Sequence, residues 1–277
     1  MPSELGLAAV DPEGTAAQGA PAAPEPPSVE LDNVSVHFGG IQALTSVSFH
    51  VAHGEIVGLI GPNGAGKTTA FNAICGFVRP TSGTVRFPAG HRANLRPSQL
   101  ARAGVSRTLQ GIGLYPHLTV LENVMAGAHI RPRGGYFFSF LALPPGIRAE
   151  RAIRRDAVAQ LERLGAARYA RRLPSEIPYG VSKKVAVARA LMCQPTLLLL
   201  DEPASGLDDA ELEEFSSLIV ELRKHMGVLL VEHDMGFVMP LVERLVVLDF
   251  GVVIATGTPR DVQSNPTVIE AYLGVQS

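Results

Sequence analysis

One eight-residue stretch of the chain has the residue types and the spacing of a phosphate-binding loop. Residues 61–68 read Gly-Pro-Asn-Gly-Ala-Gly-Lys-Thr and match the pattern G-x-x-x-x-G-K-[ST] in full. Glycines allow the backbone to curl with its N–H groups facing inward, where they can bind phosphate oxygens. Lys67 can reach the outer phosphates as a point charge, and the Thr68 hydroxyl can ligate Mg²⁺. The stretch therefore predicts a site for a nucleoside triphosphate and its metal ion.

The elements that position this loop should be a buried strand before it and a helix after it. Residues 55–60 form an apolar run that predicts the strand, and residues 69–75 have the pattern of a helix. The positive N-terminal end of such a helix would point at the bound phosphates. The residues assigned to the nucleotide here are Gly61, Pro62, Asn63, Gly64, Ala65, Gly66, Lys67, Thr68 and Thr69.

Two adjacent carboxylates follow a second apolar run. Residues 196–200 predict a buried strand that leads directly into Asp201 and Glu202. In open α/β sheets, ligands bind beyond the carboxyl ends of the strands, which is where these two side chains would lie. Asp201 is predicted to hold Mg²⁺ through water. Glu202 is predicted to orient the attacking water, because phosphoryl transfer depends on positioning and charge.

The rest of the pattern indicates an α/β protein. After residue 183, predicted helices and strands alternate, which is typical of a mostly parallel sheet flanked by helices. A β-hairpin is expected before the loop, and residues 97–179 are mostly helical in pattern, with Thr119 a candidate N-cap and Glu122 three residues later. The expected elements are strands at residues 29–38, 43–51, 84–87, 228–231, 245–248 and 252–254, and helices at residues 149–164, 183–193 and 210–225.

Two features of the helical segment have open interpretations. In its arginine-rich part, residues 149–172, acidic residues are interleaved with the arginines, and this pattern favours a solvated helix face. The alternative is a role near anionic lipid. The aromatic run at residues 136–143 is too short to span a bilayer. Burial within its own lobe is the favoured interpretation, and an exposed docking surface is the alternative.

Composition narrows the classes of protein. The net charge of −2 argues against a dedicated nucleic-acid binder. Cys75 and Cys193 have no metal-type spacing and are predicted to be buried, reduced thiols, consistent with the cytoplasm.

No apolar run reaches the ~18 residues of a membrane helix, and the start lacks the pattern of a secretory signal. Residues 1–27 are rich in Ala, Pro, Gly and Glu and are predicted to be a disordered tail.

The carboxylate segment resembles that of a known family. Residues 201–208, Asp-Glu-Pro-Ala-Ser-Gly-Leu-Asp, resemble the Walker B motif and D-loop of ABC-type ATPases. Gln110 resembles the family's Q-loop glutamine, His233 its switch histidine that contacts the γ-phosphate, and Phe38 its aromatic that stacks on adenine. The resemblance extends from residue 29 to about residue 274. It implies a P-loop NTPase of ABC type over residues 28–277, with a mostly parallel core sheet, an antiparallel β subdomain and a helical subdomain at about residues 112–180.

The resemblance also implies roles and partners. The ligands are ATP and Mg²⁺; the catalytic residues are Glu202, His233 and Gln110, and the metal site is formed by Thr68, Gln110 and Asp201. Residues 179–180, 233–235, 257–259 and 268–274 are similar to the ATPase subunits of branched-chain amino acid importers and related urea and amide systems. Such a subunit works with a second ATPase subunit, integral membrane permeases and, indirectly, a substrate-binding protein. It lies peripherally on the cytoplasmic face of the cell (inner) membrane.

The chain departs from the family at the ABC signature, normally Leu-Ser-Gly-Gly-Gln. The matching residues 177–181 read Ile-Pro-Tyr-Gly-Val, so the serine that bonds the partner's γ-phosphate is replaced by Pro178. The Gly180 backbone, the helix dipole and Ser182 remain. Loss of one charge-assisted hydrogen bond to phosphate is worth about 1.5–3 kcal/mol. We therefore expect a heterodimer in which a second ATPase supplies a fuller signature.

Three other functions stay open at this stage. The chain could serve a lipid or lipopolysaccharide exporter, whose ATPases resemble this group. It could be a soluble ABC protein that clamps nucleic acid or assists assembly, although one domain and a net charge of −2 disfavour this. It could also bind nucleotide for regulation without turnover, an interpretation that Pro178 supports.

Overall fold

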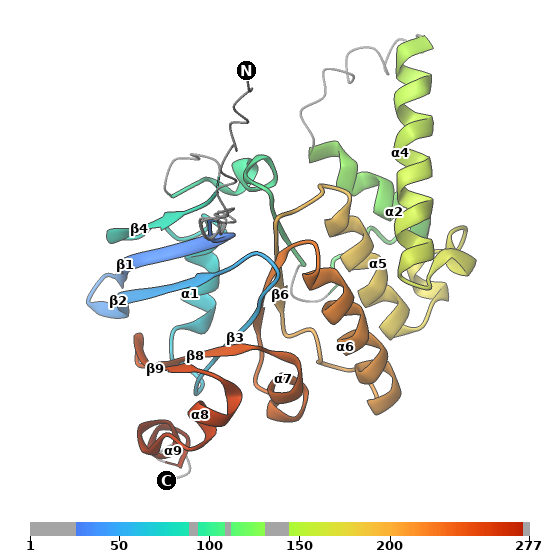
Figure 1. Ribbon diagram of the computed structural model, residues 1–277. Coiled ribbons are helices and arrows are strands. Elements are labelled where there is room, and N and C mark those ends of the chain that lie inside the picture. The colour runs from blue at the N-terminus through green and yellow to red at the C-terminus, as the bar shows by residue number, and fades with distance from the viewer. Residues whose placement is uncertain (1–25, 89–93, 109–111, 131–143, 274–277) are drawn as a thin grey trace, which may run out of the picture.

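The computed structural model describes residues 26–88, 94–108, 112–130 and 144–273. Most of the tail predicted to be disordered, the aromatic run at residues 136–143 and Gln110 lie outside these ranges. Two sheets and several helices build the described part (Figure 1). Within it, no helix is both long enough and apolar enough to cross a membrane.

The larger sheet holds the carboxylate segment and supports the phosphate loop. Its six strands lie in the order β5-β6-β7-β3-β8-β9, and all are parallel except β9, which runs antiparallel to β8. The prediction of a mostly parallel sheet is thus confirmed. The strands are β3 (Ile56–Ile60), β5 (Val105–Arg107), β6 (Leu197–Asp201), β7 (Gly227–Val231), β8 (Arg244–Asp249) and β9 (Val252–Gly257).

The smaller sheet is antiparallel, as the hairpin pattern predicts. Its order is β2-β1-β4, with β1 at Val29–Phe38, β2 at Ile41–Val51 and β4 at Ser82–Arg86. Helix α1 (Lys67–Ile74) contacts β1 and β2 on one side and β7 on the other, so it lies between the two sheets (Figure 1). The phosphate loop at its start is therefore supported from both sheets.

The core explains why the central strands read as continuous apolar runs. Alternate residues of β3 pack into two different hydrophobic clusters: Val57 and Leu59 face α1 and the small sheet, and Ile56 and Ile60 face the helices on the other side. Strands β6, β7 and β8 alternate in the same way. A strand buried on both faces has no polar positions, so its pattern lacks the alternation of a half-exposed strand.

Most of the remaining helices cover the second face of the central sheet or pack beside it (Figure 1). They are α2 (Val120–Ala126), α4 (Pro144–Arg163), α5 (Tyr179–Leu191), α6 (Asp209–Arg223), α7 (Met235–Leu241), α8 (Pro259–Gln263) and α9 (Pro266–Leu273), with short 3₁₀ turns between them. The capping box at the start of α2 is present, since the Thr119 side chain accepts from the Glu122 N–H and Glu122 accepts from the Thr119 N–H.

The structure differs from the sequence pattern in two places near the site. Strand β5 lies in the segment that reads as mostly helical; its three residues pair in parallel with β6 and are too few to give a periodic signal. Helix α5 begins at Tyr179, four residues before the predicted start, directly after Pro178 at the N-cap. Proline has the backbone torsion φ that suits a helix start and no N–H to leave unpaired there.

Candidate active site

The phosphate loop has a backbone shape that only glycine accommodates at two points. Gly61 and Gly66 have φ values of 148° and 101°. A Cβ on Gly61 would lie 2.1 Å from the Leu248 carbonyl oxygen, and one on Gly66 would lie 2.8 Å from the Ala43 carbonyl oxygen. The strands β8 and β2 therefore press on the loop from outside. The motif predicts that N–H groups on the inner side of this loop meet a phosphate.

Lys67 holds its ammonium group over the loop. Its Nζ atom donates to the carbonyl oxygens of Gly61, at 2.6 Å, and Pro62, at 2.8 Å. Burial lowers the pKa of Lys67, and the negative charge of Glu202 opposes that shift. Lys67 also begins α1, so its charge adds to the positive end of the helix. This combination suits a polyphosphate anion.

Asp201 and Glu202 lie at the carboxyl end of β6, as predicted. Burial raises the pKa of the Asp201 carboxyl, Arg107 opposes the shift, and Glu202 and Glu232 add to it. Glu202 adopts a left-handed backbone with φ of 47°, which costs a non-glycine residue about 1–3 kcal/mol. Its N–H donates to the Val231 carbonyl at 2.9 Å, which holds the turn against β7.

The structure brings His233 to Glu202. The His233 Nδ1 atom lies 3.8 Å from the Glu202 Oε1 atom, and their side chains are 65% and 40% exposed. The first comes from the loop after β7 and the second from the turn after β6. Two groups predicted to act on the same phosphate thus open to solvent side by side at the carboxyl edge of the sheet.

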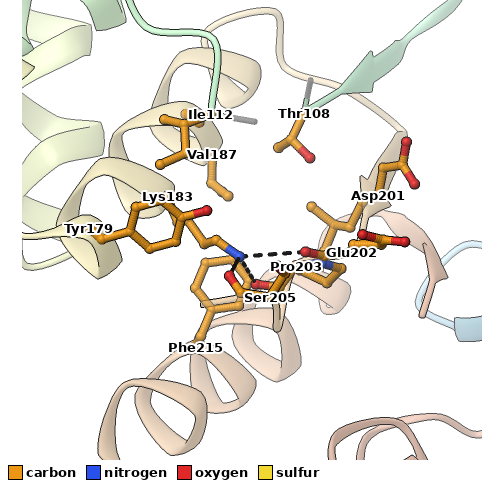
Figure 2. A pocket seen from close by; sticks show the side chains of 12 residues that line it. Thr108, Ile112, Tyr179, Lys183, Val187, Asp201, Glu202, Pro203, Ser205 and Phe215 are labelled. Carbon is orange, nitrogen blue, oxygen red and sulfur yellow. Dashed lines mark hydrogen bonds between the residues drawn. The ribbon is translucent and has the colours of Figure 1, made fainter. Parts of the chain in front are cut away.

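The other predicted residues are placed as follows. Phe38 is 50% exposed at the end of β1, so it is a surface aromatic and not part of the core. Thr68 is exposed and Thr69 half-buried in the first turn of α1. Thr108, the residue nearest Gln110 that the structure describes on its N-terminal side, lines a cavity of about 170 Å³ together with Asp201 and Glu202 (Figure 2).

The donor groups fit a magnesium ion that shares its ligands with a phosphate. Among the described residues, no group of three or more His, Cys, Asp or Glu side chains could hold a metal by itself. Mg²⁺ at nucleotide sites commonly uses one or two protein oxygens together with phosphate oxygens and water. The Thr68 hydroxyl and the Asp201 carboxylate are oxygen donors of that kind.

Comparison with known proteins identifies the family. Residues 44–205 match the family model described as "ABC transporter", and residues 252–276 match "Branched-chain amino acid ATP-binding cassette transporter". The first match covers more than half of the chain. The chain belongs to the ABC transporter family. It is an ATP-binding and ATP-hydrolysing subunit, of the kind that works with membrane permeases, and its fold is that of an ABC ATPase cassette.

Several relatives resemble this ABC ATPase over most of its length. The transport ATP-binding protein LivG of Salmonella typhimurium is 42% identical over 250 residues, which are 90% of this chain and 98% of LivG. BraF of Pseudomonas aeruginosa is 37% identical over the same shares. A crystal structure of the ADP conformation of an ABC transporter cassette is 31% identical, has a TM-score of 0.77, and covers 90% of this chain and 99% of that one. A dimeric cassette in a post-hydrolysis state with ADP and phosphate is 28% identical, with a TM-score of 0.69 and coverages of 84% and 99%.

The altered signature of this ABC ATPase forms the start of α5. Pro178 is the N-cap, and no side chain caps the helix there. Ser182 is buried, and its hydroxyl donates to the Pro178 carbonyl at 3.3 Å. The Ser182 hydroxyl is therefore bonded within its own helix and is not directed outward, as a signature serine would be. Tyr179 is 47% exposed and packs on Gly206, where a Cβ would lie 2.9 Å from the tyrosine ring.

Two charged residues near the ABC ATPase site have no counterpart in the sequence prediction. Glu232 follows β7 directly and is 1% exposed, and Lys183 lies in the second turn of α5 and is 9% exposed. Both bond to the backbone around Glu202. A carboxylate directly after an apolar strand was a usable signal for Glu232. Lys183 gave none, because a lysine in a helix pattern indicates a solvated face.

Proposed function

We propose that this ABC ATPase energises an importer of branched-chain amino acids or related small amides. The observation that supports this is the double match: LivG and BraF are named as high-affinity branched-chain amino acid transport ATP-binding proteins, and each aligns with 90% of the chain. The separate match at residues 252–276, which include β9, α8 and α9, points to the same group of transporters. The substrate itself would be recognised by other subunits.

Within the site, the predicted residues take the following roles. The loop of residues 61–68 binds the phosphates, with Thr69 at its end, and Phe38 stacks on adenine. Thr68, Asp201 and Gln110 hold Mg²⁺, which when bound would neutralise developing charge on the phosphates. Glu202 orients and deprotonates the attacking water, and His233 contacts the γ-phosphate. The proximity of Glu202 and His233, at 3.8 Å, supports this assignment.

The working assembly is a pair of ATPases on two permeases. A related cassette is dimeric with ADP and phosphate. In such a dimer each nucleotide lies between one chain's loop and the other chain's signature. Because Pro178 and the buried Ser182 present no hydroxyl, we expect a heterodimer with a second ATPase that has a fuller signature. The subunit would lie peripherally on the cytoplasmic face of the membrane, with residues 28–277 as the ATPase domain and residues 112–180 as its helical part.

The contact with the permease is assigned to residues 114–116. Tyr115 is 54% exposed, yet its backbone is fixed. The buried Asn123 amide donates to the carbonyls of Tyr115, Leu118 and Thr119, and its oxygen accepts from the Tyr115 N–H. A rigid loop with an exposed aromatic is suited to transmit a push from the helical part to a partner.

Reconstitution tests this function. The full chain is placed in proteoliposomes with a second ABC ATPase and permease subunits from its own organism. Binding protein loaded with leucine should stimulate ATP hydrolysis and drive uptake of labelled leucine, and Glu202→Gln should abolish both. Stimulation by urea or a short amide in place of leucine would select the related systems. Stimulation by lipopolysaccharide alone, or full cooperative hydrolysis by the purified chain as a homodimer, would contradict the proposal.

A further inference from the structure

Two buried charges bind the same short turn from different elements. The turn follows β6 and spans residues 202–205, and it contains the strained Glu202. Lys183 binds carbonyl groups of the turn, and Glu232 binds one of its N–H groups. Charged side chains are rarely buried without a strong local reason, because removal from water is costly unless they are fully hydrogen-bonded.

Glu232 ties together the two loops of the catalytic edge. Its Oε1 atom accepts from the Ala204 N–H at 2.6 Å, in the turn after β6. Its Oε2 atom accepts from the His233 N–H at 3.0 Å and more weakly from the Asp234 N–H at 3.4 Å, in the loop after β7. One carboxylate thus fixes the spacing between the loop of Glu202 and the loop of His233.

Lys183 ties the same turn to α5. Its Nζ atom donates to the carbonyls of Pro203 and Ser205, both at 2.5 Å, and lies 3.4 Å from the Glu202 carbonyl (Figure 2). An ammonium group has three N–H donors, and these acceptors can use all of them. The Tyr179 ring lies 5.4 Å from the same nitrogen. Since α5 begins with the altered signature, a shift of that helix would move the turn directly.

These contacts bear on the position of Glu202. A non-glycine residue stays in the left-handed region only where its surroundings hold it there. The Glu202 N–H is bound to Val231, and the three residues that follow are held by Lys183 and Glu232. We propose that Lys183 and Glu232 are positioning residues for ATP hydrolysis: they keep the Glu202 carboxylate beside His233 and couple that geometry to α5. This rests on the proposed roles of Glu202 and His233.

The test compares turnover with nucleotide affinity in the full chain assembled with its transporter. In Glu232→Gln, the remaining oxygen can still accept from the Ala204 N–H. The new NH₂ group is a donor that faces the donor N–H groups of His233 and Asp234, so those hydrogen bonds are lost. In Lys183→Met, the carbonyls of Pro203 and Ser205 lose their donor. We expect kcat to fall by about ten- to a hundredfold in each, as small displacements at an active site do. The KM and the binding of a fluorescent ATP analogue should stay near wild type, because Lys67 and its loop are unchanged.

Conservative and control variants separate positioning from general damage. Lys183→Arg retains the charge and the donors and should recover most of the rate lost in Lys183→Met. Glu221→Gln and Lys224→Met, an exposed pair on and just after α6, should leave the rate unchanged. If Glu232→Gln fails to bind nucleotide because it does not fold, the two Lys183 variants decide the outcome. Wild-type kcat in Lys183→Met would overturn the proposal, as would an equal loss in Lys183→Arg.

A double-mutant cycle then tests whether the effect passes through Glu202. In a Glu202→Gln background, Glu232→Gln should reduce the residual hydrolysis far less than it does in the wild type, since groups that act together are not additive. If Glu232→Gln reduced the rate by the same factor in both backgrounds, the positioning role would be overturned. Full turnover in Glu202→Gln alone would instead refute the proposed role of Glu202, so the two failures are distinguishable.

Discussion

Two helix N-termini are expected to meet phosphate in an ABC ATPase, and their side chains differ in this chain. One is the start of α1, which follows the phosphate loop, and the other is the start of α5, which carries the signature. The first carries Lys67 and Thr68, with the ammonium group held over the loop. The second carries Pro178, and the hydroxyl of Ser182 is bonded back to the Pro178 carbonyl inside the helix. Only the helix dipole and the backbone remain there to meet an anion.

This difference suggests that substitutions in the loop and substitutions in the signature affect two different nucleotide sites. The loop, Asp201, Glu202 and His233 belong to one chain, so the groups proposed to bind and hydrolyse ATP are local to it. In the proposed dimer, the signature would act on the nucleotide of another chain, so its loss would weaken the partner's site and not this one. Variants on the two sides should therefore have separable effects, which the following predictions measure from the largest to the smallest.

The largest effect is expected at Glu202. Glu202→Gln keeps the shape of the side chain but removes the charge that orients and deprotonates water, and loss of such a group costs about 10²–10⁴-fold in rate. Phosphate release in the assembled transporter should fall by that factor, while binding of a fluorescent ATP analogue stays within about threefold. Glu213→Gln, an exposed change on α6, serves as the matched control. Turnover at the wild-type rate would remove Glu202 from the mechanism.

Lys67 should affect binding instead. Lys67→Ala removes one charged donor to phosphate, and such a hydrogen bond contributes about 1.5–3 kcal/mol, or roughly ten- to a hundredfold in affinity. Titration with the same ATP analogue should show this loss, and Lys224→Ala, an exposed change, should not. The thermal stability without nucleotide should change little, because the bonds that Lys67 makes within the described part of the chain go to two carbonyls of its own loop. Unchanged affinity would mean that the loop binds phosphate through its backbone alone.

The sequence predicts the strands and the loop that carry the local part of the candidate site. Lys67, Asp201 and Glu202 belong to short motifs attached to apolar strands, and each strand is recognisable because both of its faces are buried. Strand β5 is different, because its three residues are a strand only through pairing with β6. A pattern within one segment contains no information about such a partner.

Contacts between distant segments account for the rest of what the pattern misses. The Glu202 backbone is held by Val231, and Lys183 and Glu232 meet only at the turn between β6 and α6. The hydrogen bond of the Ser182 hydroxyl depends on where α5 begins. Because the helix starts at Tyr179, residue 182 lies one turn after Pro178, and its hydroxyl reaches the Pro178 carbonyl. Each of these facts requires the fold.

A gain is expected on the signature side. Pro178→Ser restores a hydroxyl at the N-cap of α5, where it can reach the partner's γ-phosphate. Measured on a Glu202→Gln background, where ATP persists, the substitution should tighten ATP-dependent dimerisation of this chain by about tenfold or more, as one charge-assisted hydrogen bond would. Sedimentation with and without ATP gives the dissociation constants. Pro178→Ala is the control, since it removes proline without supplying a hydroxyl.

The smallest effect is expected at Ser182. Among the residues that the structure describes, its hydroxyl bonds to the backbone four residues earlier, a contact that slightly destabilises or bends helices. Ser182→Ala should therefore change ATP-dependent dimerisation and turnover by less than about twofold. Alanine also has the higher helix propensity, so the melting temperature should stay level or rise slightly. The same assays on the Glu202→Gln background provide the comparison with Pro178→Ser. A tenfold loss in Ser182→Ala would mean that this hydroxyl turns outward when two chains meet, and the signature of this ATPase would then be displaced by four residues and not lost.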